Sequence, residues 1–413
     1  MRPGILYITF DGLLDPIPYS QVIPYLEGFA SDGCGIHVLS FEKRGGEGRK
    51  REVSELRDRL EKRGIRWRYF AWRNRPYVIA QLFNLLEGFL TILYLACRRR
   101  IAVIHARSYP AGLLALTFKY LLGIKFLFDM RGFWADEKVD AGLWEKDGIL
   151  YRLTKRIERR LVTRADRVVV LSNQARKLLP RLVGRNHSEL PPVDVIPCCV
   201  EVERFAGVSR DEIDLRRREL GFPPDAVVVA YLGSIGTFYK FEEALDFFKV
   251  WRAARPDVRL LIMTPPPHDE VREILGRKNI QEGDWRLMSL RPEAVPAYLA
   301  TAHVGLAFFS MTFSKEASSA VRVAEYLAAG LLMVVSDKGG DVPAMVEKEE
   351  IGAVITRYSE DEYLRAVRRL ESLWPGLQDR RERCQALARE SFSHEIGLER
   401  YLHIYRELVP TQG

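Results

Sequence analysis

Short apolar runs that alternate with longer amphipathic segments constrain the fold of this chain more than any other feature. In the first half, segments with helical spacing separate the apolar runs; the runs lie at residues 5–10, 37–41, 101–106, 125–129 and 167–171, and the helical segments at 19–30, 53–63, 111–122 and 151–164. Short runs of this kind suit strands that are buried on both faces, and the helices suit the crossovers of a parallel sheet. The pattern predicts an α/β domain.

The same alternation restarts after residue 225. Strands are predicted at 226–232, 258–263, 304–309 and 332–335, and helices at 241–255 and 318–329. A chain of 413 residues has room for two such domains. We predict an N-terminal domain over 1–205, a linker over 206–225, a C-terminal domain over 226–390 and a tail helix over 391–413 that packs back on the first domain. Because ligands bind beyond the carboxyl ends of parallel strands, the two domains are expected to face a cleft.

The composition excludes several classes of protein. Hydrophobic residues make up 47% of the chain and charged residues 29%, which is typical of a globular protein. The five cysteines are scattered without a C-x-x-C pair, so neither a disulfide scaffold nor a zinc ribbon is expected. The low number of cysteines favours a cytoplasmic location. The net charge of +8 favours nucleotides, phosphates or anionic lipid as partners. The basic runs lie at helix ends or beside acids, so nucleic acid is not an expected partner.

The longest apolar stretch runs from Tyr77 to Cys97 and is followed by three arginines. Gln81, Asn84 and Glu87 interrupt it at a spacing of three, which places them on one stripe of a helix. This pattern predicts a mostly buried helix of a soluble domain rather than a membrane span. The alternative is peripheral contact of the helix and its basic end with an anionic membrane.

Polar residues follow the predicted strands of the first half. Ser20 and Gln21 are expected at a helix start, where hydroxyl, amide and backbone N–H groups suit sugar or phosphate; the alternative is a proline-rich turn with a serine cap. Arg107 and Tyr109 follow one strand and Arg131 and Trp134 follow the next; an arginine fork binds phosphate or carboxylate, and an aromatic face stacks on sugars. The alternative for both groups is an ion pair with a neighbouring acid.

The loops of the second half carry glycines, cations and one carboxylate. Gly233, Ser234 and Gly236 form a turn whose backbone N–H groups can cradle a diphosphate, with Lys240 to neutralise it. Further on, Ser318 and Ser319 are predicted to cap a helix on which Arg322 and Glu325 share a face. Arg322 and the start of this helix favour phosphate, and Glu325 can accept hydrogen bonds from ribose hydroxyls. An intrahelical ion pair is the alternative. Gly340 and Asp341 follow the next strand, where Asp341 is either a helix cap or a ligand contact.

Three motifs are missing from the sequence. There is no G-x-G-x-x-G motif and no Walker motif, which argues against dinucleotide oxidoreduction and against P-loop chemistry. No Asp-x-Asp motif occurs, so we expect any diphosphate to be held without a metal.

The order of these motifs resembles family 4 of the retaining glycosyltransferases. The segment from Ala324 to Gly330, Ala-Glu-Tyr-Leu-Ala-Ala-Gly, and the tail helix are the most specific parts. The resemblance implies the GT-B fold, in which two Rossmann-like domains face a cleft, and a nucleotide-diphosphate sugar, UDP- or GDP-linked, held mainly by the C-terminal domain. It implies that Glu325 contacts the ribose and that Lys240 and Arg322 face the diphosphate. The acceptor would lie near Ser20, Gln21, Arg107 and Arg131.

The chain departs from the family pattern at several positions. Ala317 stands where the first of two glutamates is expected, Ser234 replaces an arginine, and Asp129-Met-Arg131 replaces a histidine. We therefore predict a divergent, metal-independent retaining glycosyltransferase with Arg131, Lys240 and Arg322 as catalytic residues and no cofactor. Its acceptor would be a glycan or a lipid-linked molecule, and it would act in the cytoplasm, at the inner face of the membrane. The alternative is a weakly active or inactive partner protein of the same fold.

Overall fold

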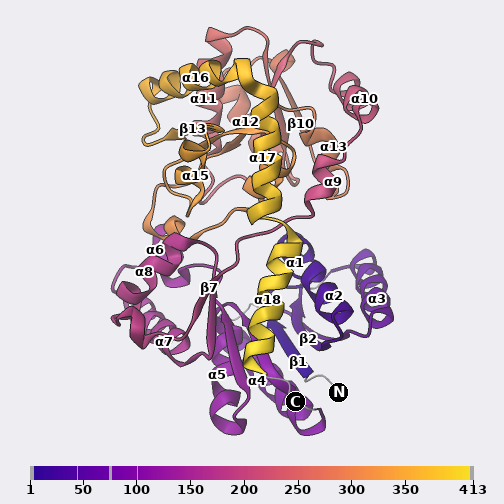
Figure 1. Cartoon of the computed structure of the whole chain (residues 1–413), viewed down its shortest axis with the longest axis vertical. Coiled ribbons are helices and arrows are strands. Elements are labelled where there is room, and N and C mark those ends of the chain that lie inside the picture. The colour runs from indigo at the N-terminus through magenta and orange to yellow at the C-terminus, as the bar shows by residue number, and fades with distance from the viewer. Residues whose placement is uncertain (1–3, 44, 74–76, 100, 410–413) are drawn as a thin grey trace. The chain divides into compact units, whose positions relative to one another are not determined.

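A computed structural model describes residues 4–43, 45–73, 77–99 and 101–409 (Figure 1). The chain forms two compact units. The first holds the residues up to Ile196 together with those from His394 onward, and the second runs from Pro197 to Ser393.

The first unit is built on a seven-stranded sheet whose described pairs are all parallel, in the order β3-β2-β1-β4-β5-β6-β7. Its strands are β1 (Gly4–Thr9), β2 (Gly35–Glu42), β3 (Arg66–Ala71), β4 (Ile101–Arg107), β5 (Lys125–Asp129), β6 (Arg167–Val170) and β7 (Val193–Val195). Its α-helices are α1 (Pro16–Gln21), α2 (Ile23–Ser31), α3 (Glu47–Lys62), α4 (Tyr77–Arg98), α5 (Ser108–Leu122), α6 (Trp134–Asp140), α7 (Ile149–Arg164), α8 (Asn173–Val183) and α18 (His394–Leu408).

The last helix, α18, belongs to the first unit although it ends the chain. It packs on α2, and the Tyr401 ring lies 5.2 Å from the Tyr25 ring and 5.9 Å from the Phe29 ring (Figure 1).

Two predicted helices of this unit differ from the structure. The segment predicted as one helix over 19–30 is two helices that meet at Val22, because Pro24 fits the first turn of a new helix and not the interior of a longer one. Helix α4 has the predicted length, but the expectation that it is mostly buried is wrong. Only about a third of its apolar stretch is buried inside the structure.

The second unit contains a six-stranded parallel sheet in the order β10-β9-β8-β11-β12-β13. Its strands are β8 (Val227–Leu232), β9 (Val258–Met263), β10 (Trp285–Met288), β11 (Val304–Ala307), β12 (Leu332–Ser336) and β13 (Gly352–Ile355). Its α-helices are α9 (Val202–Ala206), α10 (Arg210–Leu220), α11 (Phe241–Ala254), α12 (Asp269–Arg277), α13 (Val295–Leu299), α14 (Val321–Ala328), α15 (Val342–Lys348), α16 (Glu360–Leu373) and α17 (Leu377–Ser391), and a 3₁₀ turn, η3, covers Phe313–Ala317.

Residues 206–225, interpreted from the sequence as a linker, lie inside the second unit. They include α10, and Leu220 and Phe222 belong to the hydrophobic core of this unit. Most of the charged residues of this segment lie on the exposed face of α10. Their number is the reason why the sequence suggested a linker.

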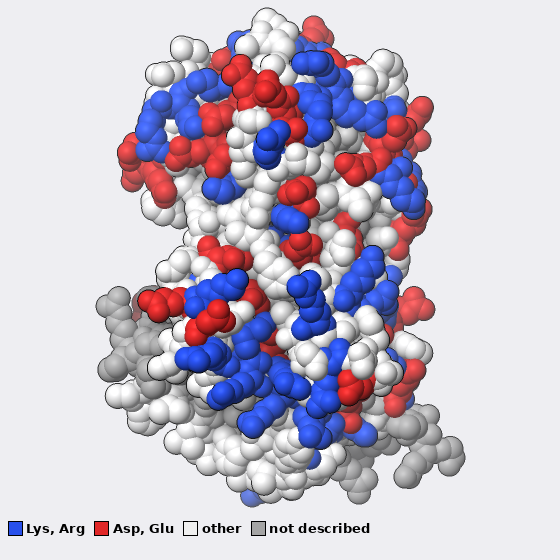
Figure 2. Space-filling model, turned by 90° about the vertical axis from the view of Figure 1, so that its left-hand side faces the viewer, with Lys and Arg blue, Asp and Glu red and all other residues white. Residues whose placement is uncertain are grey.

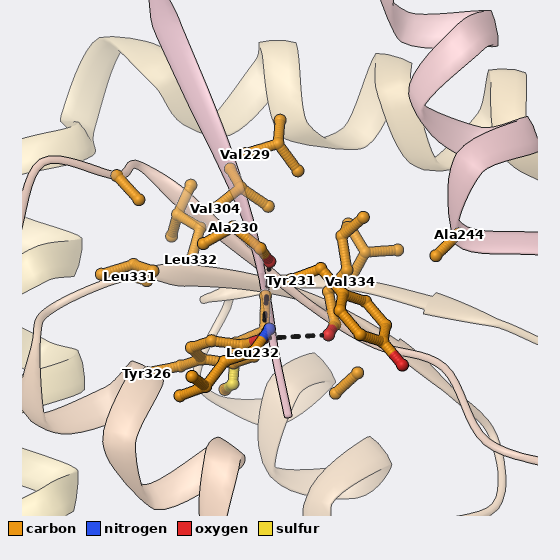
Figure 3. Close-up of a cluster of buried hydrophobic side chains, with 14 of the residues drawn as sticks. Val229, Ala230, Tyr231, Leu232, Ala244, Val304, Tyr326, Leu331, Leu332 and Val334 are labelled. Atoms are coloured by element: carbon orange, nitrogen blue, oxygen red, sulfur yellow. Dashed lines mark hydrogen bonds between the residues drawn. The ribbon is translucent and has the colours of Figure 1, made fainter. Parts of the chain in front are cut away.

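One buried tyrosine ties α14 to the second sheet (Figure 3). The Tyr326 hydroxyl accepts a hydrogen bond from the Leu232 N–H at 2.9 Å and donates one to the Leu306 carbonyl at 3.2 Å, so it touches both β8 and β11. A β-carbon on Gly305 would lie 2.4 Å from the Tyr326 ring, so the ring fits only because that strand residue is glycine. Tyr326 therefore fixes the position of α14 against the carboxyl end of β8.

Candidate active site

Helix α14 begins later than the sequence predicts. Its first residue is Val321 and Ala320 occupies the N-cap position, so Ser318 and Ser319 do not cap it. The Ser318 hydroxyl donates to the Lys315 carbonyl at 2.7 Å, and the Ser319 hydroxyl accepts from the Cys198 N–H at 3.1 Å. Both serines thus hold the segment that leads into α14.

Arg322, in the first turn of α14, has its guanidinium in an aromatic cage. The guanidinium carbon lies 4.3 Å from the Tyr239 ring centroid, 5.1 Å from that of Tyr231 and 5.9 Å from that of Phe309. The side chain is buried, and its Nη1 atom has no hydrogen-bond partner. Buried charged groups are normally paired. A buried cation with an unsatisfied N–H group is a place where an anion can bind.

Gly233 makes the close approach of Arg322 possible. Its φ angle is +107°, and a β-carbon there would lie 2.5 Å from Arg322 Nη2. The following residue, Ser234, is held through its carbonyl, which accepts a hydrogen bond from the Tyr231 hydroxyl at 2.8 Å. Gly236 also has a positive φ of 84°. The predicted glycine turn therefore exists, and its first residue packs directly on the caged guanidinium.

Glu325 lies one turn after Arg322 on α14. Burial raises the pKa of its carboxyl to about 7, although Arg322 and Arg204 act in the opposite direction. Within the described residues its carboxylate has no hydrogen-bond or ion-pair partner, so the two side chains do not form the intrahelical ion pair that was the alternative. A partly buried carboxylate with unused oxygens is suited to accept hydrogen bonds from hydroxyl groups.

Lys240 is paired with a carboxylate. Its ammonium forms an ion pair with Glu243 at 2.9 Å, at the start of α11. A hollow of about 470 Å³ beside it is lined by more acidic than basic side chains; the charged ones are Lys240, Glu242, Glu243, Asp246, Glu270 and Lys278. The structure therefore joins Gly233, Arg322 and Glu325, and it engages Lys240 with a carboxylate.

Lys315 is a buried cation that the sequence reasoning did not select. It lies in η3, and its ammonium is 3.8 Å from the centroid of the Phe238 ring. The predicted loop after β12 reaches the same place, because the Gly340 N–H donates to the Lys315 carbonyl at 3.2 Å. Asp341 occupies the N-cap position of α15. A lysine next to a glutamate in a serine-rich run gives no sequence signal for such a buried position.

In the first unit, two predicted cations meet around one buried carboxylate. Arg107 ends β4 and is opposite Asp129, which ends β5. The Asp129 carboxylate lies 3.6 Å from Arg107 Nη1 and 3.5 Å from Arg131 Nη1. Burial by itself raises the pKa of Asp129, but Arg131, His105 and Arg107 outweigh it and hold that pKa well below its usual range. Arg107 Nε has no hydrogen-bond partner, and Arg131 has a φ of +58°. Such strain in a non-glycine residue is typical of functional sites.

The helix α18 completes this cluster with residues far away in the sequence. His105 Nδ1 lies 2.7 Å from the Tyr405 hydroxyl, and the Tyr401 hydroxyl donates to Asp129 at 3.3 Å. Burial lowers the pKa of His105. The sequence did not predict the contacts of His105 with Tyr405 and of Asp129 with Tyr401, because nothing local links the carboxyl ends of β4 and β5 to the tail helix.

The other predicted acceptor residues serve the unit itself. Tyr109 is buried, and its hydroxyl donates to Glu158 at 2.5 Å and to the Gly132 carbonyl at 3.1 Å. Trp134 packs beside it with ring centroids 5.5 Å apart and stays partly exposed. The Ser20 hydroxyl bonds to carbonyls of its own helix, and Gln21 is buried at the end of α1, so neither lies at a helix start.

Comparisons with known proteins agree with this architecture. Residues 24–199 match the family described as glycosyl transferase 4-like domain, and residues 227–372 match glycosyl transferases group 1. Together the two matches take in most of both units. The chain belongs to the GT-B glycosyltransferases. A curated relative, the probable glycosyltransferase WbjE of Pseudomonas aeruginosa, is 34% identical over 110 residues, which is 26% of each chain, so the match spans about a quarter of that relative's length.

Solved structures resemble this glycosyltransferase over nearly its whole length. A glycosyltransferase from Rickettsia africae is 14% identical with a TM-score of 0.73 and covers 100% of both chains. Sucrose-phosphate synthase from Thermosynechococcus elongatus is 15% identical with a TM-score of 0.73, covering 98% of this chain and 99% of its own. HepE from Anabaena, in complex with UDP and glucose, is 13% identical with a TM-score of 0.69 and the same coverage. At these identities the likeness shows the fold.

Proposed function

We propose that this glycosyltransferase takes a sugar from a nucleotide-diphosphate donor, UDP- or GDP-linked, bound to its second unit. The observation that carries the proposal is Arg322, whose buried Nη1 atom has no partner and whose guanidinium packs on Gly233. A diphosphate oxygen would supply the missing acceptor, and the unpaired Glu325 carboxylate would accept hydrogen bonds from ribose hydroxyls. That HepE holds UDP and glucose in its structure supports this class of donor.

We further propose that transfer proceeds with retention of configuration and without a metal. The bond from the anomeric carbon to the diphosphate breaks, a bond to the acceptor oxygen forms on the same face, and the acceptor proton passes to the departing diphosphate. Arg322 would stabilise the negative charge that develops on the diphosphate, because a fixed buried cation needs no reorganisation during the reaction. No side-chain nucleophile is required for this course.

The acceptor is proposed to be a glycan or a lipid-linked molecule that meets the first unit near Arg107 and Arg131. Both guanidinium groups lie beside the Asp129 carboxylate there, and a guanidinium group is suited to bind a phosphate or carboxylate of the acceptor. We place the protein in the cytoplasm, in peripheral contact with an anionic membrane at its inner face.

A second candidate is a weakly active or inactive partner protein of the same fold. Ala317 stands where the family pattern has a glutamate, and the neighbouring Glu316 is paired with Lys338 at 2.6 Å. This arrangement leaves the position without a carboxylate for the sugar.

A panel of UDP-, GDP- and ADP-sugars distinguishes the two candidates. The enzyme should be stabilised against heat by one nucleotide class and should release that nucleoside diphosphate slowly, equally well with and without EDTA. The anomeric configuration of the product, read by NMR, tests retention. Stabilisation without any nucleotide release would favour the inactive partner, and loss of release with EDTA would refute metal independence.

A further inference from the structure

The outward face of α4 is apolar over about five helical turns. Before its final arginine, every residue of α4 that the structure describes as exposed is uncharged, and these residues recur at spacings of three and four; they are Ile79, Leu82, Phe83, Leu86, Leu90, Leu93, Tyr94 and Cys97. Soluble helices normally turn their apolar stripe to the core. Here the apolar stripe, as we call these eight residues, faces outward.

Contacts on the inward face of α4 fix which side of the helix packs against the first unit. Asn84 is buried and its Nδ2 donates to the Arg73 carbonyl at 2.9 Å. Glu87 forms an ion pair with Arg73 at 2.5 Å. At Gly88 a β-carbon would lie 2.7 Å from Leu114 of α5, so glycine is needed for the close contact of the two helices. Two of the three polar residues that interrupt the apolar sequence, Asn84 and Glu87, thus bind α4 to its own unit.

Helix α4 is long and apolar enough to cross a bilayer, but its place in the fold argues against crossing. It connects β3 to β4, and both strands belong to one parallel sheet. A helix that crossed a membrane would put these two strands on opposite sides of it. The apolar stripe can therefore only lie along a surface.

Four exposed arginines gather at the C-terminal end of the stripe. Arg66 and Arg68 alternate on the edge strand β3, Arg98 is the last residue of α4, and Arg99 follows it. Three of them lie close enough to the buried His37 to act on it. Burial and, to a smaller extent, the charges of Arg66, Arg99 and Arg68 lower the pKa of His37 to about 4. Across the described residues, none of the four arginines has an ion-pair partner.

Aromatic and apolar groups continue the surface beside these arginines. The guanidinium carbons of Arg68 and Arg98 lie 4.7 and 5.6 Å from the Tyr94 ring centroid. Tyr120, Leu121 and Leu122 are exposed at the end of α5, which packs beside α4; both helices end at the same edge of the sheet because β4 and β5 are parallel neighbours. An aromatic ring between cations and aliphatic side chains is the composition of membrane-interface segments.

Further positive charge lies on the helices next to α5. Helix α7 packs on α5 and carries six lysines and arginines against one glutamate. Figure 2 shows lysine and arginine side chains gathered on the part of the molecule that carries α7 and α8. The field at this side of the first unit is therefore positive beyond the four arginines.

We propose that the apolar stripe and the four arginines dock on a phospholipid bilayer with anionic headgroups, with α4 lying in the plane of the interface. The apolar side chains enter the boundary of the acyl chains, and the arginines bind headgroup phosphates. A second copy of the chain is the weaker fit, because it would bring four more exposed arginines to the same surface. This inference deepens the proposed membrane contact and is independent of the donor site.

Flotation with large unilamellar vesicles tests the proposal. The protein should float with phosphatidylcholine vesicles that contain about 30% phosphatidylglycerol, but not with phosphatidylcholine alone, and binding should fall as salt screens the arginines. Cys97 is the exposed one of the five cysteines, so a polarity-sensitive dye on it should shift to the blue on the anionic vesicles. Failure of the protein to float with anionic vesicles would overturn the proposal.

Variants separate the two parts of the surface. Leu86→Glu with Leu90→Glu should weaken vesicle binding at least about tenfold, and so should Arg66→Gln with Arg68→Gln and Arg98→Gln. The matched control Leu215→Glu changes an exposed leucine of α10 in the second unit and should bind as the wild type does. Donor hydrolysis without vesicles should be equal in all of them, so its loss would concern the donor site alone. Dimers that the leucine variants convert to monomers would instead show that a second copy covers α4.

Discussion

Arg322 Nη2 lies 2.5 Å from the point that a β-carbon on Gly233 would occupy. Tyr326 anchors α14 to β8 and β11 one turn further on, so the helix that carries Arg322 cannot move away from the glycine turn. The loop after β8 and the start of α14 therefore form one rigid surface around a buried cation. The proposed donor site is expected to respond to any change that separates these two residues.

Gly233→Ala should remove donor binding without changing any charge. The new methyl group would displace the guanidinium, and alanine is strained at a φ of +107°. We expect the free energy of unfolding to fall by about 1–3 kcal/mol and stabilisation by the nucleoside diphosphate to be lost, as read by thermal shift. Gly276→Ala is the control, because its β-carbon on α12 meets no atom within 4 Å. It should stabilise the protein by up to about 1 kcal/mol and keep donor binding. Equal donor affinity in both variants would contradict the assigned contact.

Arg322→Met should separate binding from stability. Methionine fills much of the same volume within the rings of Tyr231, Tyr239 and Phe309 but cannot pair with phosphate. Because Nη1 is unsatisfied, removal of the charge should change the free energy of unfolding by no more than about 2 kcal/mol. The affinity for the nucleoside diphosphate, measured by calorimetry, should fall about 10- to 100-fold. Arg368→Met, on the exposed side of α16, should keep both quantities. Unchanged affinity in Arg322→Met would exclude it from the donor site.

Glu325 makes the stability of the second unit depend on pH. Its pKa is about 7 in the folded protein against an ordinary value of 4.5, so the folded state binds more protons than the unfolded state between these values. The free energy of unfolding therefore falls as the pH rises from about 4.5 to 7, by up to about 3 kcal/mol, with partial exposure of the side chain reducing this figure. Glu325→Gln should remove the loss, so it should be more stable than the wild type at pH 8 and equal to it near pH 4.5.

Urea unfolding at the two pH values measures this effect. Glu382→Gln, on the exposed face of α17, is the control and should follow the wild type at both. In the proposed function, the same Glu325→Gln change should weaken binding of the nucleoside diphosphate, because glutamine replaces one of the two acceptor oxygens with a donor NH₂ group and leaves an uncharged, weaker acceptor for the ribose hydroxyls. A variant that keeps the pH dependence of the wild type would show that another group causes it.

The sequence was enough to predict the two parallel sheets and the grouping of some residues of the candidate site. Strands such as β8 and β12 are continuous apolar runs because both faces are covered, and that pattern is local. Arg322 and Glu325 could be paired from their spacing on one helix, and Gly233 from its place after a strand. Such local patterns can be recognised in the sequence because the residues involved are neighbours along one element or one turn in the folded protein as well.

Features that depend on distant contacts could not be predicted. Ser319 resembles a helix cap, yet its hydroxyl accepts the N–H of Cys198, which lies 121 residues away in the sequence. His105 meets Tyr405 across 300 residues. The prediction that α4 is mostly buried is wrong for another reason. A stripe of polar residues shows that a helix has two different faces, but it does not show which face packs against the protein. In α4 the polar face packs inward, because the buried Asn84 has a hydrogen-bond partner there.

Arg131 offers a test that separates backbone strain from charge. At a φ of +58°, glycine relieves strain that alanine keeps, so Arg131→Gly should be more stable than Arg131→Ala by about 1 kcal/mol. Both variants leave Asp129 with one guanidinium fewer, so its pKa should rise, and the stability that this carboxylate contributes above its unfolded pKa should shrink in both. In the proposed function both should lower transfer to an acceptor far more than donor hydrolysis. Transfer restored by glycine but not by alanine would mean that the backbone conformation, and not the guanidinium, is what the acceptor requires.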